Sequence, residues 1–103
     1  MTDADLVNAL RDCYDTLQQQ NIVSLGLVQH ATLEIDRDAP GANVRSVPAR
    51  YIARITLRAP SSDDARNAQL RAQIENRLAG LLAISRTEIE MLPALFPILG
   101  GRL

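Results

Sequence analysis

The chain has 103 residues, of which 47% are hydrophobic and 22% are charged, and its formal net charge is −1. This length predicts a single domain over residues 1–103 with a modest core. The near-neutral charge and the 3% of aromatic residues exclude a basic nucleic-acid footprint and a base-stacking platform. The longest apolar run is broken by Pro93 and Pro97 and is shorter than the roughly 20 residues that span a bilayer. We therefore expect no nucleic-acid partner and no membrane partner.

Cysteine and histidine each occur once, as Cys13 and His30. A lone cysteine forms no internal disulfide, and no basic-then-apolar leader precedes the first predicted helix, so we expect a cytoplasmic protein. Cys13 lies beside an apolar stripe and is expected to be a core residue rather than a reactive thiol. One thiol and one imidazole are too few ligands for a metal, so we expect no metal and no cofactor.

The first predicted helix follows the cap Thr2-Asp3-Ala4-Asp5 and continues until the polar run of residues 18–20. Its apolar face consists of Leu6, Leu10, Cys13 or Tyr14, and Leu17. Alternation then predicts a strand from Leu27 to Asp36. The residues expected to face inward are Leu27, Ala31, Leu33 and Ile35, and those expected to face outward are Val28, His30, Thr32, Glu34 and Asp36.

Residues 37–50 contain Pro40-Gly41 and Pro48, which predict a long loop that is a candidate for a mobile or partner-facing segment. A second strand is predicted from Tyr51 to Arg58. Its inward residues are Tyr51, Ala53, Ile55 and Leu57, and its outward residues are Ile52, Arg54, Thr56 and Arg58. Because the outward faces are mostly polar, we expect helices on one side of the sheet only.

The second strand runs into a long helix through a junction of hydroxyl and acidic residues. Ser61 and Ser62 are good N-cap residues, and Asp63 and Asp64 suit the positive end of the helix dipole. Unpaired N–H groups at a helix start can also hold an anion. Two interpretations of the junction remain open: a capped helix with no further role, or a functional site. The candidate junction residues are Thr56, Pro60, Ser61, Ser62 and Asp63.

The second helix is predicted from the helical spacing of Leu70, Ile74, Leu78 and Leu81, with Gly80 placed to end it. Its solvated side is expected to carry Arg66, Arg71, Glu75 and Arg77. A third strand is predicted from Arg86 to Leu92. The order helix-strand-strand-helix-strand predicts an α+β two-layer sandwich, with both helices on one face of a small mixed sheet. An apolar tail, residues 92–103, is expected to cover the open sheet face or to mediate a homodimer.

The sequence contains no phosphate loop, no GxGxxG, no HExxH, no CxxC and no GxSxG pattern. A Ser-His-Asp set assembled from Ser61 or Ser62 with His30 rests on residue types too common to carry a prediction. We therefore assign no catalytic residue.

Two longer segments carry a family resemblance. Tyr14-Asp15 is followed by Asn21-Ile22-Val23-Ser24-Leu25-Gly26-Leu27-Val28, and the junction reads Ile55-Thr56-Leu57-Arg58-Ala59-Pro60-Ser61-Ser62-Asp63. These segments resemble the YDPE-like turn, the NIVDLGLV segment and the TLTAPGCP junction of the metal-sulfur cluster assembly domain family. That family includes the eukaryotic cytosolic iron-sulfur targeting factor and the bacterial phenylacetate-degradation accessory protein. The resemblance extends from about Leu6 to Met91, and it marks Asp15, Asn21 and Gly26 as family-matched residues.

The chain differs from the family at its most reactive position. Ser62 stands where the family has a junction cysteine, and Thr16 and Leu17 stand where it has proline and glutamate. A neutral hydroxyl is a far poorer iron ligand than a thiolate. The resemblance therefore implies a non-enzymatic adaptor in iron-sulfur cluster or metalloprotein maturation, which binds assembly proteins or client apoproteins without holding a cluster. The alternatives are a small enzyme or anion-binding protein that uses the Ser61-Ser62 helix start, and a structural subunit of a larger complex.

Overall fold

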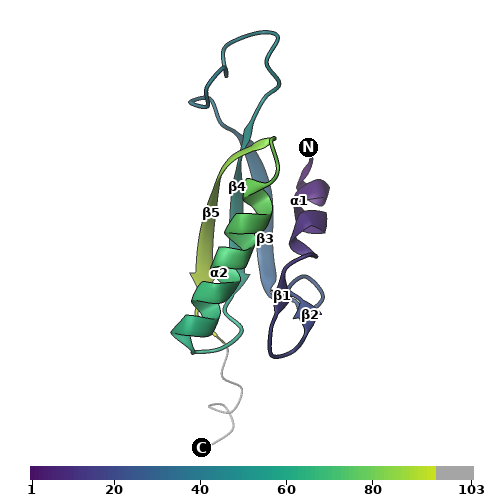
Figure 1. Cartoon of the computed structure of the whole chain (residues 1–103), viewed down its shortest axis with the longest axis vertical. Helices are drawn as coiled ribbons and strands as arrows, with labels where there is room; N and C mark the ends of the chain where they lie inside the picture. Colours follow the sequence, from purple (N-terminus) through teal and green to yellow (C-terminus); the bar gives the residue numbers. More distant parts are fainter. Residues whose placement is uncertain (95–103) are drawn as a thin grey trace, which may run out of the picture.

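The computed structural model describes residues 1–94. The elements in chain order are α1 (Asp3–Leu10), β1 (Tyr14–Asp15), β2 (Gln20–Asn21), β3 (Val28–Ile35), β4 (Tyr51–Arg58), α2 (Asp64–Ala79) and β5 (Ile84–Leu92). The central strand β4 pairs antiparallel with β3 and parallel with β5, so the three-stranded sheet is mixed. Strands β1 and β2 form a separate antiparallel pair. Both helices lie on one face of the larger sheet (Figure 1), which confirms the predicted α+β fold.

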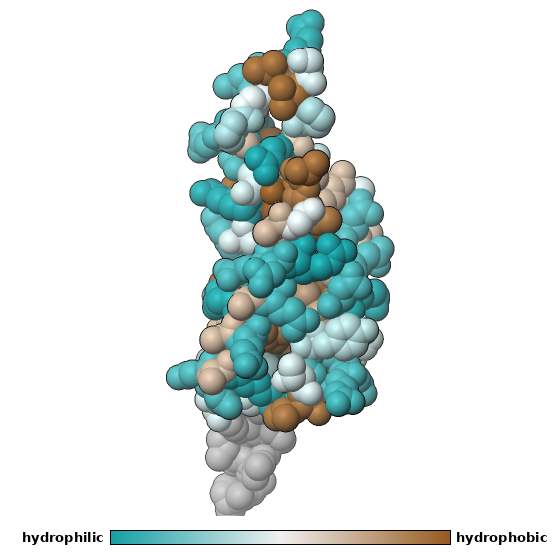
Figure 2. Space-filling view, viewed as in Figure 1, coloured by the Kyte–Doolittle hydropathy of each residue, from teal (hydrophilic) through white to brown (hydrophobic). Residues whose placement is uncertain are grey.

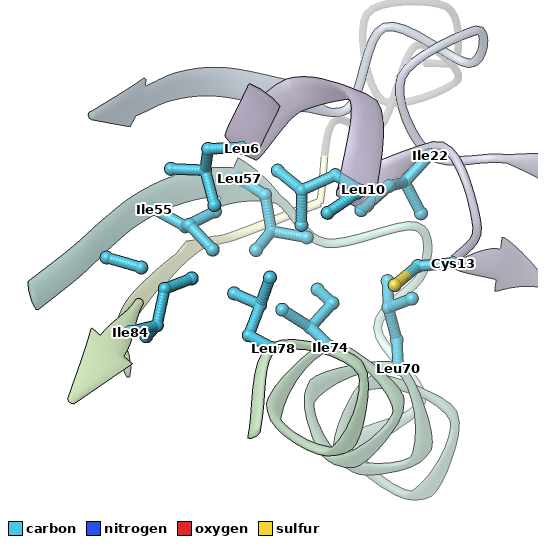
Figure 3. Close-up of a cluster of buried hydrophobic side chains, with 12 residues drawn as sticks. Leu6, Leu10, Cys13, Ile22, Ile55, Leu57, Leu70, Ile74, Leu78 and Ile84 are labelled. Carbon is cyan, nitrogen blue, oxygen red and sulfur yellow. The ribbon is translucent and has the colours of Figure 1, made fainter. Parts of the chain in front are cut away.

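The core lies between the two helices and the helix-facing side of β4. Figure 3 shows aliphatic side chains from these elements meeting in one cluster. The predicted packing of the α2 stripe against the sheet is confirmed, because Leu70, Ile74 and Leu78 are buried with Ile55 and Leu57. Burial of one such side chain contributes roughly 1.5–3 kcal/mol. With few aromatic residues, the stability of the domain depends on these aliphatic contacts.

The opposite side of α2 faces outward. Figure 2 shows a mostly hydrophilic surface over the middle of this helix, as expected for a helix that packs with a single apolar stripe. The helix ends at Ala79 with Gly80 as its C-cap, which confirms the predicted stop. Within residues 1–94, no helix combines the length and the apolar character needed to cross a membrane.

The first helix is shorter than predicted. It ends at Leu10, with Arg11 as its C-cap, and the N–H of Cys13 donates to the carbonyl oxygen of Leu10 at 3.0 Å. The chain then turns back through β1 and β2, so Leu17 is 73% exposed. The prediction of a helix from residue 11 to residue 17, with Leu17 on its buried face, is therefore wrong. Contacts with α2 hold Tyr14 and Asp15 in extended backbone, and local periodicity carries no information about such contacts.

The face predictions for β3 and β4 fail at the end of the sheet nearest the long loop. Asp36, expected outward, is buried, and its carboxylate accepts hydrogen bonds from Ser85 Oγ at 2.5 Å and from the Asp38 N–H at 3.0 Å. Ile35, expected inward, is 49% exposed. Ile52, expected outward, is buried beside the start of the loop. The side chain of Asp36 anchors the start of the loop of residues 37–50, which explains why the residues next to the loop do not follow the predicted inward and outward faces. Figure 1 shows that the loop then extends beyond the sheet.

The open face of the sheet is charged. Arg54 pairs with Glu34 at 3.2 Å and also with Glu88, and Glu88 pairs with Arg86 at 3.5 Å. His30 is exposed on the same face, as predicted. The predicted docking of the tail concerns chiefly residues 95–103, which lie outside the described part of the chain.

Candidate functional site

The junction between β4 and α2 is closed by its own hydrogen bonds. Asp63 is the N-cap, and its Oδ1 accepts from the N–H groups of Ala65 at 2.9 Å and Arg66 at 3.4 Å. The prediction of Ser61 or Ser62 as the N-cap is therefore wrong. Ser61 Oγ instead accepts from the Asp63 N–H at 3.0 Å. Because a carboxylate already occupies the helix start, the junction has little capacity left for an anion.

The structure brings four of the five predicted junction residues together. Pro60, Ser61, Ser62 and Asp63 are consecutive, and Ser62 is exposed. Thr56 lies within β4 between His30 and Glu90 of the neighbouring strands, on the open face away from the helices. His30 therefore sits beside Thr56 rather than beside the junction serines, and the arrangement offers no Ser-His pair for nucleophilic catalysis.

Asp15 is joined to the start of α2 by an ion pair. Arg66 Nε donates to Asp15 Oδ1 at 2.9 Å, and Arg66 Nη2 bonds Asp15 Oδ2, so the pair is bidentate. The side chain of Asp15 is 1% exposed and that of Arg66 is 15% exposed. The hydrogen bonds from Arg66 hold the pKa of Asp15 below its usual value, and Asp15 in turn raises the pKa of Arg66. This ion pair joins two segments that are 51 positions apart in the sequence.

Two further contacts extend this connection along α2. Gln73 bonds both backbone groups of Tyr14, accepting from its N–H at 2.7 Å and donating to its carbonyl oxygen at 3.0 Å. Arg77 Nε donates to Asp12 Oδ2 at 3.0 Å. Arg66, Gln73 and Arg77 therefore form one polar face of α2 that lies along residues 12–15. The prediction of a solvated side is wrong for Arg66, whose side chain is 15% exposed, whereas the Arg77 side chain is 37% exposed and pairs with Asp12 at the surface.

Sequence reasoning missed Arg66 and Gln73, although Arg66 carried a signal. A cation in the first turn of a helix opposes the helix dipole, so Arg66 is poorly placed unless an acidic group elsewhere in the fold pairs with it. We find no comparable signal for Gln73.

Asn21 and Gly26 shape the end of the turn segment, residues 11–26. Asn21 Oδ1 accepts from the Ser24 N–H at 2.8 Å, and Asn21 Nδ2 donates to Ser24 Oγ at 3.0 Å. Gly26 has a φ of 72°, which favours glycine strongly over residues with a Cβ. Asn21 and Gly26 thus stabilise the return of the chain into β3, and they are positioning residues rather than ligands.

The turn segment also presents apolar side chains to solvent. Tyr14 is 48% exposed, and Leu17 is more exposed still. Figure 1 shows β1 and β2 at the same end of the molecule as the start of α2. We use the name junction–turn surface for five of the exposed residues at this end: Tyr14, Thr16, Leu17, Ser62 and Asp63.

The thiol and the imidazole are not combined into a metal site. Cys13 is fully buried, and burial raises the pKa of its thiol to about 11. Within the described residues, 1–94, there is no group of three His, Cys, Asp or Glu side chains that could hold a metal ion.

A groove of about 470 Å³ opens beside the junction, between the first turns of α2 and the end of β5. We call it the junction groove. Its apolar lining residues are Ala59, Ala68, Met91, Leu92, Pro93 and Ala94, and its polar ones are Ser61, Ser62, Asp64, Asn67 and Arg71. Arg71 also donates to the carbonyl oxygen of Ile89 at 3.1 Å, which fixes its guanidinium on β5.

The chain matches no known family model, and searches of curated proteins and of solved structures likewise find no match.

Proposed function

We propose that this chain is a non-enzymatic adaptor in iron-sulfur cluster or metalloprotein maturation, acting in the cytoplasm without holding a cluster itself. The resemblance of the turn and junction segments supports the maturation pathway. The observation that carries the adaptor role is the bidentate Asp15–Arg66 pair, which joins the turn segment to the first turn of α2, directly after the junction. Its partners would be iron-sulfur assembly proteins or client apoproteins.

Tyr14 and Leu17 are the apolar groups that a partner would bury on the junction–turn surface. Exposed large side chains of this kind, rimmed by polar residues, are typical of protein interaction sites. Asp15 and Gln73 hold the backbone beneath them, so the surface is preorganised for binding. Ser62 offers an exposed hydroxyl where the family that the sequence resembles has a thiol.

Capture from extracts of the native host tests this proposal, with Leu17→Ser as the variant. Leu82→Ser is the matched control, because Leu82 is 90% exposed and lies in the α2–β5 connection, at the opposite end of α2. We expect quantitative mass spectrometry to identify assembly or client proteins with the wild type and with Leu82→Ser, and to show their loss with Leu17→Ser. Equal capture by both variants, or partners unrelated to metalloproteins, would contradict the proposal.

The absence of a bound cluster is tested separately, by anaerobic reconstitution with iron and sulfide. We expect a colourless protein, because the thiol is buried and protonated and the imidazole lies elsewhere. A stable visible absorption band that Cys13→Ala removes would overturn this part of the proposal.

The anion-binding alternative is less well supported, because the Asp63 carboxylate occupies the helix start that an anion would need. A role as a structural subunit and self-association through the tail of residues 92–103 are the remaining alternatives. Light scattering on the full chain, over a range of concentrations, tests self-association.

A further inference from the structure

The last described residues form part of the junction groove. Met91 and Leu92 end β5, and Pro93 and Ala94 continue along the groove wall. Nine residues follow Ala94 in the sequence, and five of them are large and apolar: Leu95, Phe96, Ile98, Leu99 and Leu103. Two extended residues reach about 7 Å, so Leu95 and Phe96 start within reach of the groove.

We propose that the junction groove binds the apolar C-terminal segment, residues 95–103, of the same chain. The groove volume of about 470 Å³ lies within the range of roughly 300–1,000 Å³ for pockets that bury most of a drug-sized ligand, so the groove has room for a few side chains of the segment. The lining is suited to this occupant, because Ala59, Ala68 and Met91 supply apolar walls. Phe96, the one phenylalanine of the chain, is the anchoring side chain.

The open sheet face is a poorer place for the same segment. Its centre is the network of Glu34, Arg54, Arg86 and Glu88. Covering these exposed ion pairs with leucine and phenylalanine would remove water from the charges and return no hydrogen bond. The charged sheet face is therefore a less favourable binding site for residues 95–103 than the junction groove.

A second apolar hollow, lined in part by Met1, Leu81 and Leu82, lies beside the start of β5. Strand β5 extends about 26 Å from Ile84 to Leu92 at a rise of roughly 3.3 Å per residue, and Ala94 lies two residues beyond its end. The nine following residues span at most about 30 Å when fully extended. Reaching this hollow would consume nearly the whole segment, so the junction groove is the better supported site.

Binding within one chain is favoured over exchange between two copies. A short tether gives an effective concentration on the order of millimolar, provided that the linker spans the distance. That condition is met here because the segment begins at the groove.

Tryptophan fluorescence tests the inference, since the chain contains no tryptophan. We expect the Phe96→Trp chain to emit at shorter wavelength than the same chain in denaturant, independently of protein concentration. Ala68→Glu adds a carboxylate to the groove lining and should shift the emission toward that of solvated tryptophan. Ala72→Glu is the control, because Ala72 is exposed on α2 outside the groove and the substitution should leave the emission unchanged.

Three outcomes would overturn the inference. Solvent-like emission from Phe96→Trp would show that the groove does not bind the segment, and an equal effect of Ala68→Glu and Ala72→Glu would place the segment elsewhere. A shift that grows with concentration, together with a larger mass by light scattering, would assign the segment to a second copy. None of these readouts depends on partner capture, so the inference and the adaptor function fail separately.

Discussion

Helix α2 and the turn segment lie against each other but rely on different interactions. The helix places Leu70, Ile74 and Leu78 in the core over three successive turns. The turn segment contributes Cys13 and Ile22 to the core, with Val23 packed against it, and is also attached to α2 by ion pairs and hydrogen bonds. Burial of apolar surface is non-directional, whereas hydrogen bonds fix geometry. The helix therefore supplies stability, and its polar face determines the shape of the turn segment.

The largest expected effect is a loss of core packing in α2. Ile74→Ala removes buried methyl and methylene groups and should lower the free energy of unfolding by about 2–5 kcal/mol. This is a large fraction of the roughly 5–15 kcal/mol available to a small domain. Chemical denaturation measures it, with exposed Glu75→Ala as the control, expected to change stability by less than about 0.5 kcal/mol. Wild-type stability of Ile74→Ala would contradict the assigned core.

The second effect concerns the polar attachment of the turn segment. Asp15→Asn keeps the shape of the side chain but leaves Arg66 without its charged partner, at a cost of about 1–3 kcal/mol. Asp12→Asn is the matched control, because the Asp12 side chain is 61% exposed and surface pairs contribute roughly 0–1 kcal/mol. If the two variants unfold at the same denaturant concentration, the buried pair is not what attaches the turn segment.

The stability difference between wild type and Asp15→Asn should also depend on pH. Arg66 holds the pKa of Asp15 below its usual value, so below about pH 4 the unfolded chain binds a proton that the folded chain does not. The stability supplied by this carboxylate is present above that pH and is lost as the pH falls through the depressed pKa. The difference in unfolding free energy between wild type and Asp15→Asn should therefore stay constant from pH 7 to pH 5 and narrow in stronger acid. A difference that widens on acidification would show the opposite sign of coupling.

A smaller effect on stability distinguishes Asp63, which caps α2, from Ser62, which does not. Asp63→Ala removes the N-cap acceptor of α2 and should cost about 0.5–2 kcal/mol. Ser62→Ala should leave thermal stability unchanged, since Ser62 is exposed and does not cap the helix. A larger loss from Ser62→Ala than from Asp63→Ala would restore the serine cap that the sequence suggested.

The same contrast explains which parts of the structure could be predicted from the sequence. The stripe of α2 and the alternation of β4 are local patterns with strong periods, and both elements appear where expected. The turn segment shows a helical period as well, but Gln73 and Arg66 hold Tyr14 and Asp15 in extended backbone. Partners more than fifty positions away leave no periodic trace.

The candidate site shows the same division. A strand pattern changes to a helix pattern at the junction, which predicts a helix start there, and α2 does start at Asp64. Its actual cap, Asp63, and its connection to Asp15 depend on side-chain geometry that residue types alone do not determine. The burial of Asp36 could not be predicted from the local pattern either, because its hydrogen-bond partner, Ser85, is 49 positions away.

The smallest expected effect tests the turn segment most directly. Leu17→Ser should change the free energy of unfolding by less than about 0.5 kcal/mol, because this leucine is largely exposed. Leu10→Ala, at a fully buried position of α1, should cost about 2–5 kcal/mol. A helix continuing to residue 17 would place both leucines on one buried face and make both substitutions costly. Unchanged stability of Leu17→Ser would confirm the turn, and any loss of partner capture by this variant would then reflect the junction–turn surface rather than unfolding.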